Sequence, residues 1–516
     1  MTTGSEANPL SLRSVRRRLL SGSAWVLGAK VATLIVGIGV QALIAHLLTQ
    51  SQFGIYATAF TMALLGAAMA QLGLDRAVVR FVAGAIGLGE LGRARIAIST
   101  ALAYGTLAAV SAGVILSAGL GQFLANHVFD KPALALAIPF IAGWLISLAV
   151  QSLMVESFRG MSRFAAATLL DELFVDSVAL TVFAALYVTV GHAGKTPMPA
   201  DGRLGVAGPN IVIGVWTAAT AIAVAIGLTM LLRRYRALKG TGDLPRREMF
   251  QTAWPLGVTN VAILLLGSAV DVLVLSAFVP SDTVGLYGAS ARLVIFVATP
   301  FVVFSGVIPP IIAELHAQQK MRQLERALRA GATLAGLPAF GVLLIFLLFG
   351  PWVLGKVFSA PYSAGAPILA ILSLGRLYAI WAGSAGVTLM MTGYQKAMMK
   401  LTLGCGVLSV SLGLGVAYAL KRAGYPPIDV AIGVACATVS AIVLQNTLQL
   451  ALVRRRLGIW TMIHFSPKEL YRYLRPRGQK GVAMEDAAER VAEALVGPDD
   501  DPIVEASTDE DPPASS

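Results

Sequence analysis

Apolar segments of about 20 residues alternate with short polar loops along most of the chain. A helix of that length crosses the hydrocarbon core of a bilayer. We predict about twelve such spans, near residues 22–47, 54–74, 97–119, 133–155, 167–190, 209–232, 254–279, 285–312, 328–350, 364–390, 398–420 and 428–452. The pattern therefore predicts an all-α integral membrane protein with about 12 transmembrane helices.

One local pattern occurs twice: a very short loop ending in Gly-x-Tyr between two apolar segments. The copies contain Gly54 with Tyr56 and Gly285 with Tyr287, and they align without a gap at an offset of about 231 residues. We therefore predict two six-helix bundles, residues 22–232 and 254–452, related by an axis along the membrane normal. Transporters built from such repeats rock around a site between the halves near the bilayer midplane.

The glycines and tyrosines of this motif also carry a local expectation. A glycine permits a tight turn just before a helix. A tyrosine suits the membrane interface because its ring is apolar and its hydroxyl group is polar. We therefore expect Gly54 and Gly285 in turns, and Tyr56 and Tyr287 at the outer interface.

The charge pattern fixes an expected orientation. Of 516 residues, 56% are hydrophobic and 13% are charged, against about 25% charged in soluble domains. Most Lys and Arg fall in alternate loops, on the side of the N-terminus. Because cytoplasmic loops are enriched in these residues, both termini are predicted to be cytoplasmic. The net charge of +12 is thus attributed to topology and anionic lipid contact, and no nucleic-acid partner is expected.

The same pattern predicts three cytoplasmic segments outside the two bundles. Residues 1–21 form a basic N-terminus, residues 233–253 a linker, and residues 453–516 a tail that is first basic and then acidic. The acidic, proline-containing end of the tail is expected to be largely disordered.

Several kinds of chemistry are not expected. Cys405 and Cys436 fall inside predicted spans, as small apolar packing residues do. The chain has no P-loop motif, and its histidines lack metal-ligand spacing. The longest outer loop, about residues 191–208, carries few groups suited to catalysis. We therefore predict a protein that is not an enzyme and has no cofactor, with H⁺ or Na⁺ as the coupling ion if transport is coupled.

The stretch Ser23–Val82 carries a family resemblance. It has a Trp near the start of the first span, Ala-x-Leu-Leu at its end, the Phe-Gly-x-Tyr motif, and then Leu72-Gly73-Leu74 with Arg76, Arg80 and Phe81. In this it resembles the bacterial polysaccharide or O-antigen flippases of the Wzx type, in the superfamily of the multidrug and toxic compound extruders. His46 departs from the pattern, since the family often has Arg there, and any anchoring of this span end would be weaker.

The resemblance implies two six-helix bundles around a central cavity, an extruder-like fold. It also implies the cargo, a lipid-linked oligosaccharide carried from the cytoplasmic to the periplasmic leaflet of the bacterial inner membrane for polysaccharide or lipopolysaccharide biosynthesis. The implied partners are the lipid bilayer and the polysaccharide polymerase and chain-length proteins.

Ionisable residues inside the spans are the candidate site residues, because each costs at least about 2.5 kcal/mol at the bilayer centre unless it faces a cavity or a partner. Lys30, Arg292 and Arg376 lie at different depths and suit an anionic cargo such as a lipid pyrophosphate. We predict that they bind substrate and line one central cavity. Lys30 could instead snorkel to the inner surface.

Two buried acids are candidates for ion coupling or for ion pairs. Asp271 and Arg292 have similar predicted depths and could form a buried pair. Asp176 could carry a coupling proton, because burial disfavours the charged carboxylate. It could equally be a partner for Lys30.

Two other functions stay open at this stage. The first is an ion-coupled drug or metabolite antiporter of the extruder type. Those proteins export mostly cationic compounds and often carry an acid in the first span, whereas this chain has Lys30 there and no acid. The second, less favoured, is a membrane glycosyltransferase or polymerase, which usually needs a larger outer loop.

Overall fold

The computed structural model describes residues 28, 32–192, 208–238, 240, 244–305 and 308–463. Every regular element in these ranges is a helix, which confirms the predicted all-α class. The first half contains an apolar helix Ala32–Leu47, α2 (Gln50–Ala70), α3 (Leu74–Gly87), α4 (Leu91–Ile115), η1 (Leu116–Leu120), α5 (Gly121–Phe123), η2 (Leu124–Val128), α6 (Pro132–Gly160), α7 (Phe164–Thr168), η3 (Leu169–Leu173), α8 (Phe174–His192) and α9 (Pro209–Ala237).

The second half, in the described ranges, also consists of helices. It contains α10 (Arg246–Leu265), α11 (Ser268–Phe278), α12 (Ser281–Leu293), α13 (Ile295–Ser305), α14 (Ile308–Ala317), α15 (Met321–Val357), η4 (Ala360–Gly365), α16 (Ala366–Trp381), α17 (Ala385–Met391), α18 (Gln395–Arg422) and α19 (Pro427–Leu457). In the described ranges, nine helices are long and apolar enough to cross a membrane, or ten if α10 and α11, bent by 58°, form one span. The exact count of twelve stays a prediction.

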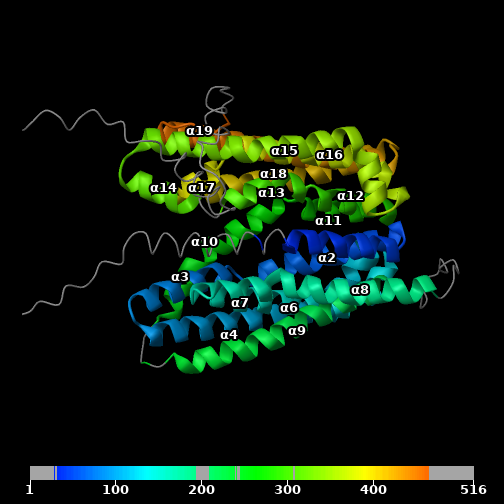
Figure 1. The fold of residues 1–516 in the computed structure, drawn as a ribbon. Coiled ribbons are helices and arrows are strands. Elements are labelled where there is room, and N and C mark those ends of the chain that lie inside the picture. Colours follow the sequence, from blue (N-terminus) through cyan, green and yellow to red (C-terminus); the bar gives the residue numbers. More distant parts are fainter. Residues whose placement is uncertain are drawn as a thin grey trace, which may run out of the picture.

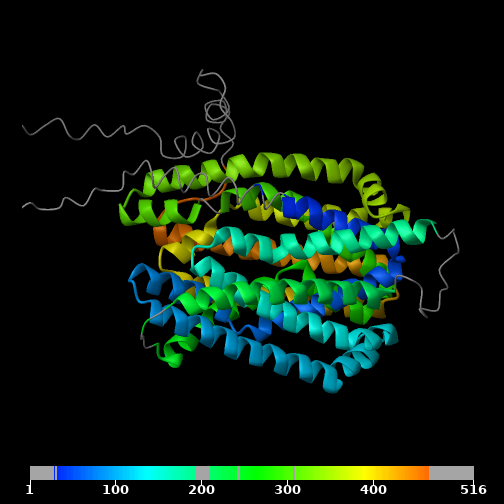
Figure 2. The ribbon, with the colours of Figure 1, turned by 60° about the horizontal axis from the view of Figure 1, so that its bottom comes forward.

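The helices form two groups that lie side by side in Figure 1. The turned view of Figure 2 shows that the long helices of both groups run in roughly the same direction. One group contains α2 to α9 and the other α11 to α19, while α10 runs between them (Figure 1). The helix α10 packs against both α3 and α18, so it touches both groups. The predicted boundaries at residues 232 and 254 stay a prediction.

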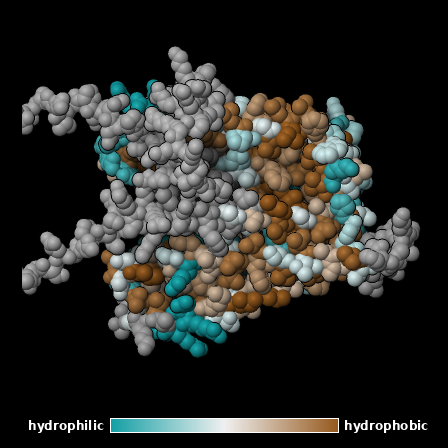
Figure 3. All heavy atoms as spheres, in the orientation of Figure 1, coloured by the Kyte–Doolittle hydropathy of each residue, from teal (hydrophilic) through white to brown (hydrophobic). Residues whose placement is uncertain are grey.

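The molecular surface matches a membrane environment. Apolar residues cover the central part of the face in Figure 3, and hydrophilic residues gather towards its edge at the right. Large apolar side chains such as Leu136 and Leu348 are exposed. Apolar patches of this extent are rare on soluble monomers, and a lipid environment accounts for them.

The glycines of the repeated motif do not lie in turns, so that expectation is wrong. Thr49 and Gln52 form a capping box, which starts α2 at Gln50 and places Gly54 inside the helix. Gly285 likewise lies inside α12. A Cβ on Gly54 would stand 1.8 Å from the Ser281 carbonyl oxygen, and one on Gly285 would stand 2.4 Å from that of Gln50. The glycines are needed because the backbones of α2 and α12 touch there.

The tyrosines of the motif are also not at the interface. Tyr56 and Tyr287 are both 0% exposed and lie in the core shared by the two halves. Since α2 and α12 pack against one another, the side chains that follow each glycine face protein and not lipid headgroups.

Candidate functional site

The face between the two halves is built around α2 and α12. The ends with Gln50 and Ser281 are called outer ends, following the predicted orientation. There the Gln50 Nε2 donates to the carbonyl oxygen of Asp282 at 3.2 Å. Further inward along α2, the hydroxyl oxygens of Thr58 and Ser276 lie 2.7 Å apart and share a hydrogen bond. Backbone contact and polar bonds thus join the halves towards their outer ends.

Each buried tyrosine of the motif binds the preceding membrane segment. The Gln41 Nε2 donates to the Tyr56 hydroxyl oxygen at 3.0 Å. In the second half, the Tyr287 hydroxyl donates to the Asp271 carboxylate at 2.5 Å. Both bonds join a motif tyrosine to the helix before it, but the partner is a neutral amide in one half and a carboxylate in the other.

Asp271 is held by neutral donors and not by an arginine. Its second carboxylate oxygen accepts from the Thr438 hydroxyl at 2.6 Å, and the side chain is buried. The ion pairs in the described part of the chain do not include one between Asp271 and Arg292. Two hydroxyl groups instead satisfy the carboxylate, which ties α11 to α12 and α19.

Arg292 points from the second half onto an aromatic side chain of the first half. Its guanidinium carbon lies 4.0 Å from the ring centre of Phe60 on α2. The Phe60 ring packs edge-on against Trp144 at 5.4 Å, and Trp144 stacks on Trp216 at 5.8 Å. A cation over an aromatic face is attracted to its π electrons, most strongly where water is scarce. Arg292 therefore joins the two halves without a carboxylate.

Arg376 lies on the side of α16 that faces α12. At 100° per residue, it shares a side with Gly365 and Leu369, and a Cβ on Gly365 would meet the Ser290 hydroxyl at 2.6 Å. Leu374, on the opposite side, is 48% exposed. Arg376 is itself exposed, and among the residues described it has neither an ion pair nor a hydrogen bond.

The acid of the first half lies beside the first helix. The Asp176 Oδ2 would be 3.1 Å from a Cβ on Gly37, so α8 places this carboxylate against Ala32–Leu47. Lys30 lies outside the described residues, and its proposed roles stay predictions. Arg292, Arg376, Asp271 and Asp176 thus come from four different helices.

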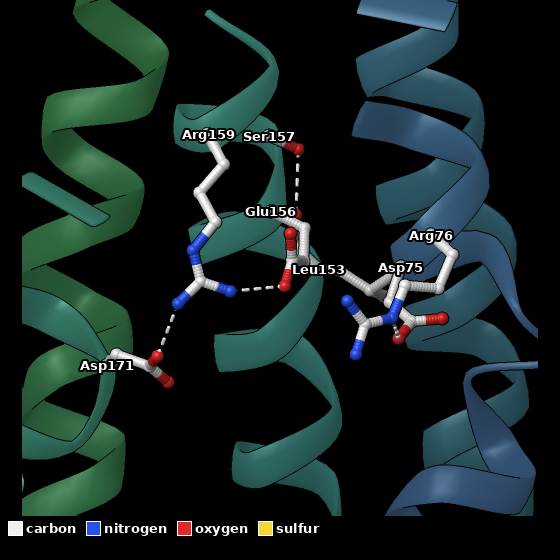
Figure 4. Close-up of polar contacts among 7 residues, drawn as sticks. All are labelled: Asp75, Arg76, Leu153, Glu156, Ser157, Arg159 and Asp171. Carbon is white, nitrogen blue, oxygen red and sulfur yellow. Dashed lines mark hydrogen bonds and ion pairs between the residues drawn. The ribbon is translucent and has the colours of Figure 1, made fainter. Parts of the chain in front are cut away.

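A second charged cluster, which the sequence patterns did not single out, occupies the inner end of the first half (Figure 4). Arg159 at the end of α6 forms ion pairs with Glu156 and with Asp171, the latter at 2.6 Å. On α3, Asp75 and Arg76 lie 3.7 Å apart. Burial raises the pKa of the Asp75 carboxyl group, and the neighbouring Arg76 opposes this shift. The i, i+3 spacing of Glu156 and Arg159 was visible in the sequence, but the partner Asp171 follows a chain reversal.

The cluster adjoins a broken turn in the fifth predicted span. Asp171 has a ψ of −105°, which interrupts the helix within η3. The Gln151 Nε2 of α6 donates to the carbonyl oxygens of Leu170 at 2.7 Å and Asp171 at 2.5 Å. Free backbone carbonyls are costly at membrane depth, so Gln151 stabilises the break.

Comparisons with known proteins agree with this architecture. The family model described as polysaccharide biosynthesis protein matches residues 19–316. No curated protein matches the chain significantly. An inward-facing multidrug resistance MATE family transporter of the MOP superfamily is similar in structure, with a TM-score of 0.65, 12% identity and coverage of 83% of this chain and 94% of that one.

Two further solved structures have the same fold. A MOP superfamily transporter from Pyrococcus furiosus, whose binding pocket is described as of reverse polarity, has a TM-score of 0.59, 14% identity and coverage of 84% of this chain and 94% of its own. An outward-facing MATE family transporter has a TM-score of 0.55, 14% identity and coverage of 84% and 95%. These likenesses establish an extruder-like fold.

Proposed function

Because the chain belongs to the polysaccharide biosynthesis protein family, we propose that it moves a lipid-linked oligosaccharide from the cytoplasmic to the periplasmic leaflet of a bacterial inner membrane. The family and the fold identify a multi-pass membrane transporter and not an enzyme. The identity of the cargo, the direction of transport and its mechanism are what we propose.

One observation carries the choice of an anionic cargo. Arg292 and Arg376 lie in membrane-spanning helices, and neither has a carboxylate partner among the described residues. A cation in hydrocarbon is costly without counter-charge. A diphosphate group supplies that charge, and a guanidinium matches its oxygens with paired N–H donors. A cationic drug would be repelled at the same positions.

The mechanism we propose is rocking of the two halves. The backbone contact of α2 with α12 closes the outer end, so export requires the contact at Gly54 and Gly285 to open. The Arg292–Phe60 contact crosses between the same halves, and it too would separate. An incoming diphosphate would replace the ring as the partner of Arg292.

Asp271 and Asp176 are the candidates for coupling this motion to H⁺ or Na⁺. We favour Asp271, because its hydrogen-bond partners Tyr287 and Thr438 are neutral and leave its charge uncompensated. Transport into vesicles should lose its dependence on an imposed ion gradient in Asp271→Asn. An unchanged dependence would exclude Asp271 from this role.

The cargo hypothesis is tested at Arg376. In cells whose surface polysaccharide depends on this protein, Arg376→Ala should lower display at unchanged protein abundance, with a loss of about tenfold or more expected for a charged contact. Arg376→Lys should restore it in part, because an ammonium group lacks the planar fork. The control is Arg422→Ala at an exposed helix end. Full display with Arg376→Ala would overturn the proposal.

A further inference from the structure

The residues that follow α19 fold back onto the second half and are named here the strap, residues 458–463. Gly458 ends α19 in a left-handed conformation with a φ of +73°, which reverses the chain direction. Ile459 and Thr461 are buried. The guanidinium of Arg454, on the last turn of α19, lies 5.6 Å from the ring centre of Trp460. The strap is therefore packed and not a loose extension.

The strap binds at the break between α16 and α17. α16 ends at Trp381, Gly383 has a φ of +76°, and α17 begins at Ala385. Helix ends leave backbone carbonyls without intrahelical donors. The Ile463 N–H donates to the Trp381 carbonyl oxygen at 2.8 Å, and the Thr461 hydroxyl donates to that of Ala382, also at 2.8 Å. The strap thus supplies the donors that the broken helix lacks.

Two glycines show how closely the strap fits. A Cβ on Gly383 would come within 2.2 Å of the Thr461 carbonyl oxygen. A Cβ on Gly336 of α15 would come within 3.1 Å of the Ile463 Cδ1. The strap therefore occupies a site formed by α15 and the end of α16, and links both to α19.

We infer that Thr461 and Ile463 are positioning residues for Arg376. Arg376 precedes the end of α16 by about one and a half turns, so the strap holds the end of the short helix that presents this arginine. Without the strap donors, the end of this short helix is free to shift, and rotation of α16 about its axis would move the guanidinium off the side that faces α12. The inference rests on the proposed anion site at Arg376.

The test measures binding of inorganic pyrophosphate to purified full-length protein by calorimetry. Thr461→Val removes the hydroxyl donor while keeping the shape, and should weaken binding about fivefold, the factor expected for one lost hydrogen bond. Ile463→Pro removes the other donor and should act in the same direction. Thr392→Val is the matched control, because among the described residues the Thr392 hydroxyl bonds within its own helical segment, to the Thr388 carbonyl.

A double substitution separates positioning from general stability. If the strap acts through Arg376, Thr461→Val should have no further effect on pyrophosphate binding in Arg376→Ala. Equal weakening in both backgrounds, or no weakening in either, would overturn the inference while the effect of Arg376→Ala supports the proposed function. If Arg376→Ala itself leaves pyrophosphate binding unchanged, both the anion site and the inference are contradicted.

Discussion

At the residue scale, two glycines without a Cβ allow the backbones of the two halves to touch. Gly54 and Gly285 each face the backbone of the other half, and neither site has room for a Cβ. Small residues at a helix crossing let backbones approach closely, which replaces the hydrophobic driving force that is absent between helices in lipid.

Substitution of these glycines should open that contact. Gly54→Ala and Gly285→Ala should each lower the free energy of unfolding by about 1–3 kcal/mol through overpacking, measured as thermal stability in detergent. Gly404→Ala is the control, since no atom lies within 4 Å of a Cβ there and the site is inside α18. A destabilisation at Gly404 as large as at Gly54 would contradict the argument.

A second prediction at this scale concerns Lys131, which precedes α6 in the loop between two spans. Its side chain is 7% exposed, and its Nζ has no hydrogen-bond partner in the described part of the chain. Burial lowers the pKa of Lys131 to about 8, with Asp282 opposing the shift. Because the unfolded chain keeps a pKa near 10.4, it binds more protons between about pH 8 and pH 10, and stability rises with pH in that window.

Lys131→Met should abolish this rise, which is worth on the order of 3 kcal/mol between the two ends of the window. The measurement is thermal stability in detergent at about pH 7.5 and about pH 10. Lys356→Met, at an exposed lysine, should leave the rise in place. A parallel pH dependence in Lys131→Met and the unchanged protein would show that another group is responsible.

At the element scale, the breaks in helices are stabilised by neighbouring elements. Gln151 of α6 binds the two carbonyls freed in η3, and the strap binds those freed after α16. The helix α10 shows a related feature: it bends by 58° from α11 and reaches α3, where Gly73 and Gly257 approach closely. Arg93 of α4 and Glu248 of α10 form an exposed ion pair, which contributes little by itself.

Gln151→Leu should therefore destabilise the protein by about 1–3 kcal/mol, because one buried and one partly buried carbonyl would lose their donor. The control is Gln445→Leu, since Gln445 makes one longer bond, 3.3 Å, to the Thr402 hydroxyl. The measurement is the thermal stability of both variants in detergent, compared with that of the unchanged protein. Equal losses would mean that the broken turn of η3 does not need its side-chain donor.

At the scale of the whole molecule, the distribution of Lys and Arg predicts the orientation. A reporter that is active only in the periplasm should be silent when fused after Val453 and active when fused near Lys195. Immunoblots establish that both fusions are made. The reverse pattern of activity would overturn the orientation and with it the direction of transport proposed here.

The sequence by itself determined the fold class and contains the repeated Gly-x-Tyr motif. Membrane helices are visible as apolar runs because a span of about 20 residues must satisfy its backbone internally and expose apolar side chains to lipid. The two Gly-x-Tyr copies were visible because the same short motif occurs once in each half of the sequence. Candidate cations were found because charges are rare in spans.

Only the tertiary structure decided what those residues touch. Asp271 binds Tyr287 and Thr438 and not Arg292, because α19 and α12 converge on it from distant parts of the chain. Arg292 meets Phe60 since α2 and α12 cross at their glycines. Such contacts depend on the rotation and crossing of packed helices, which period and composition along one chain do not fix.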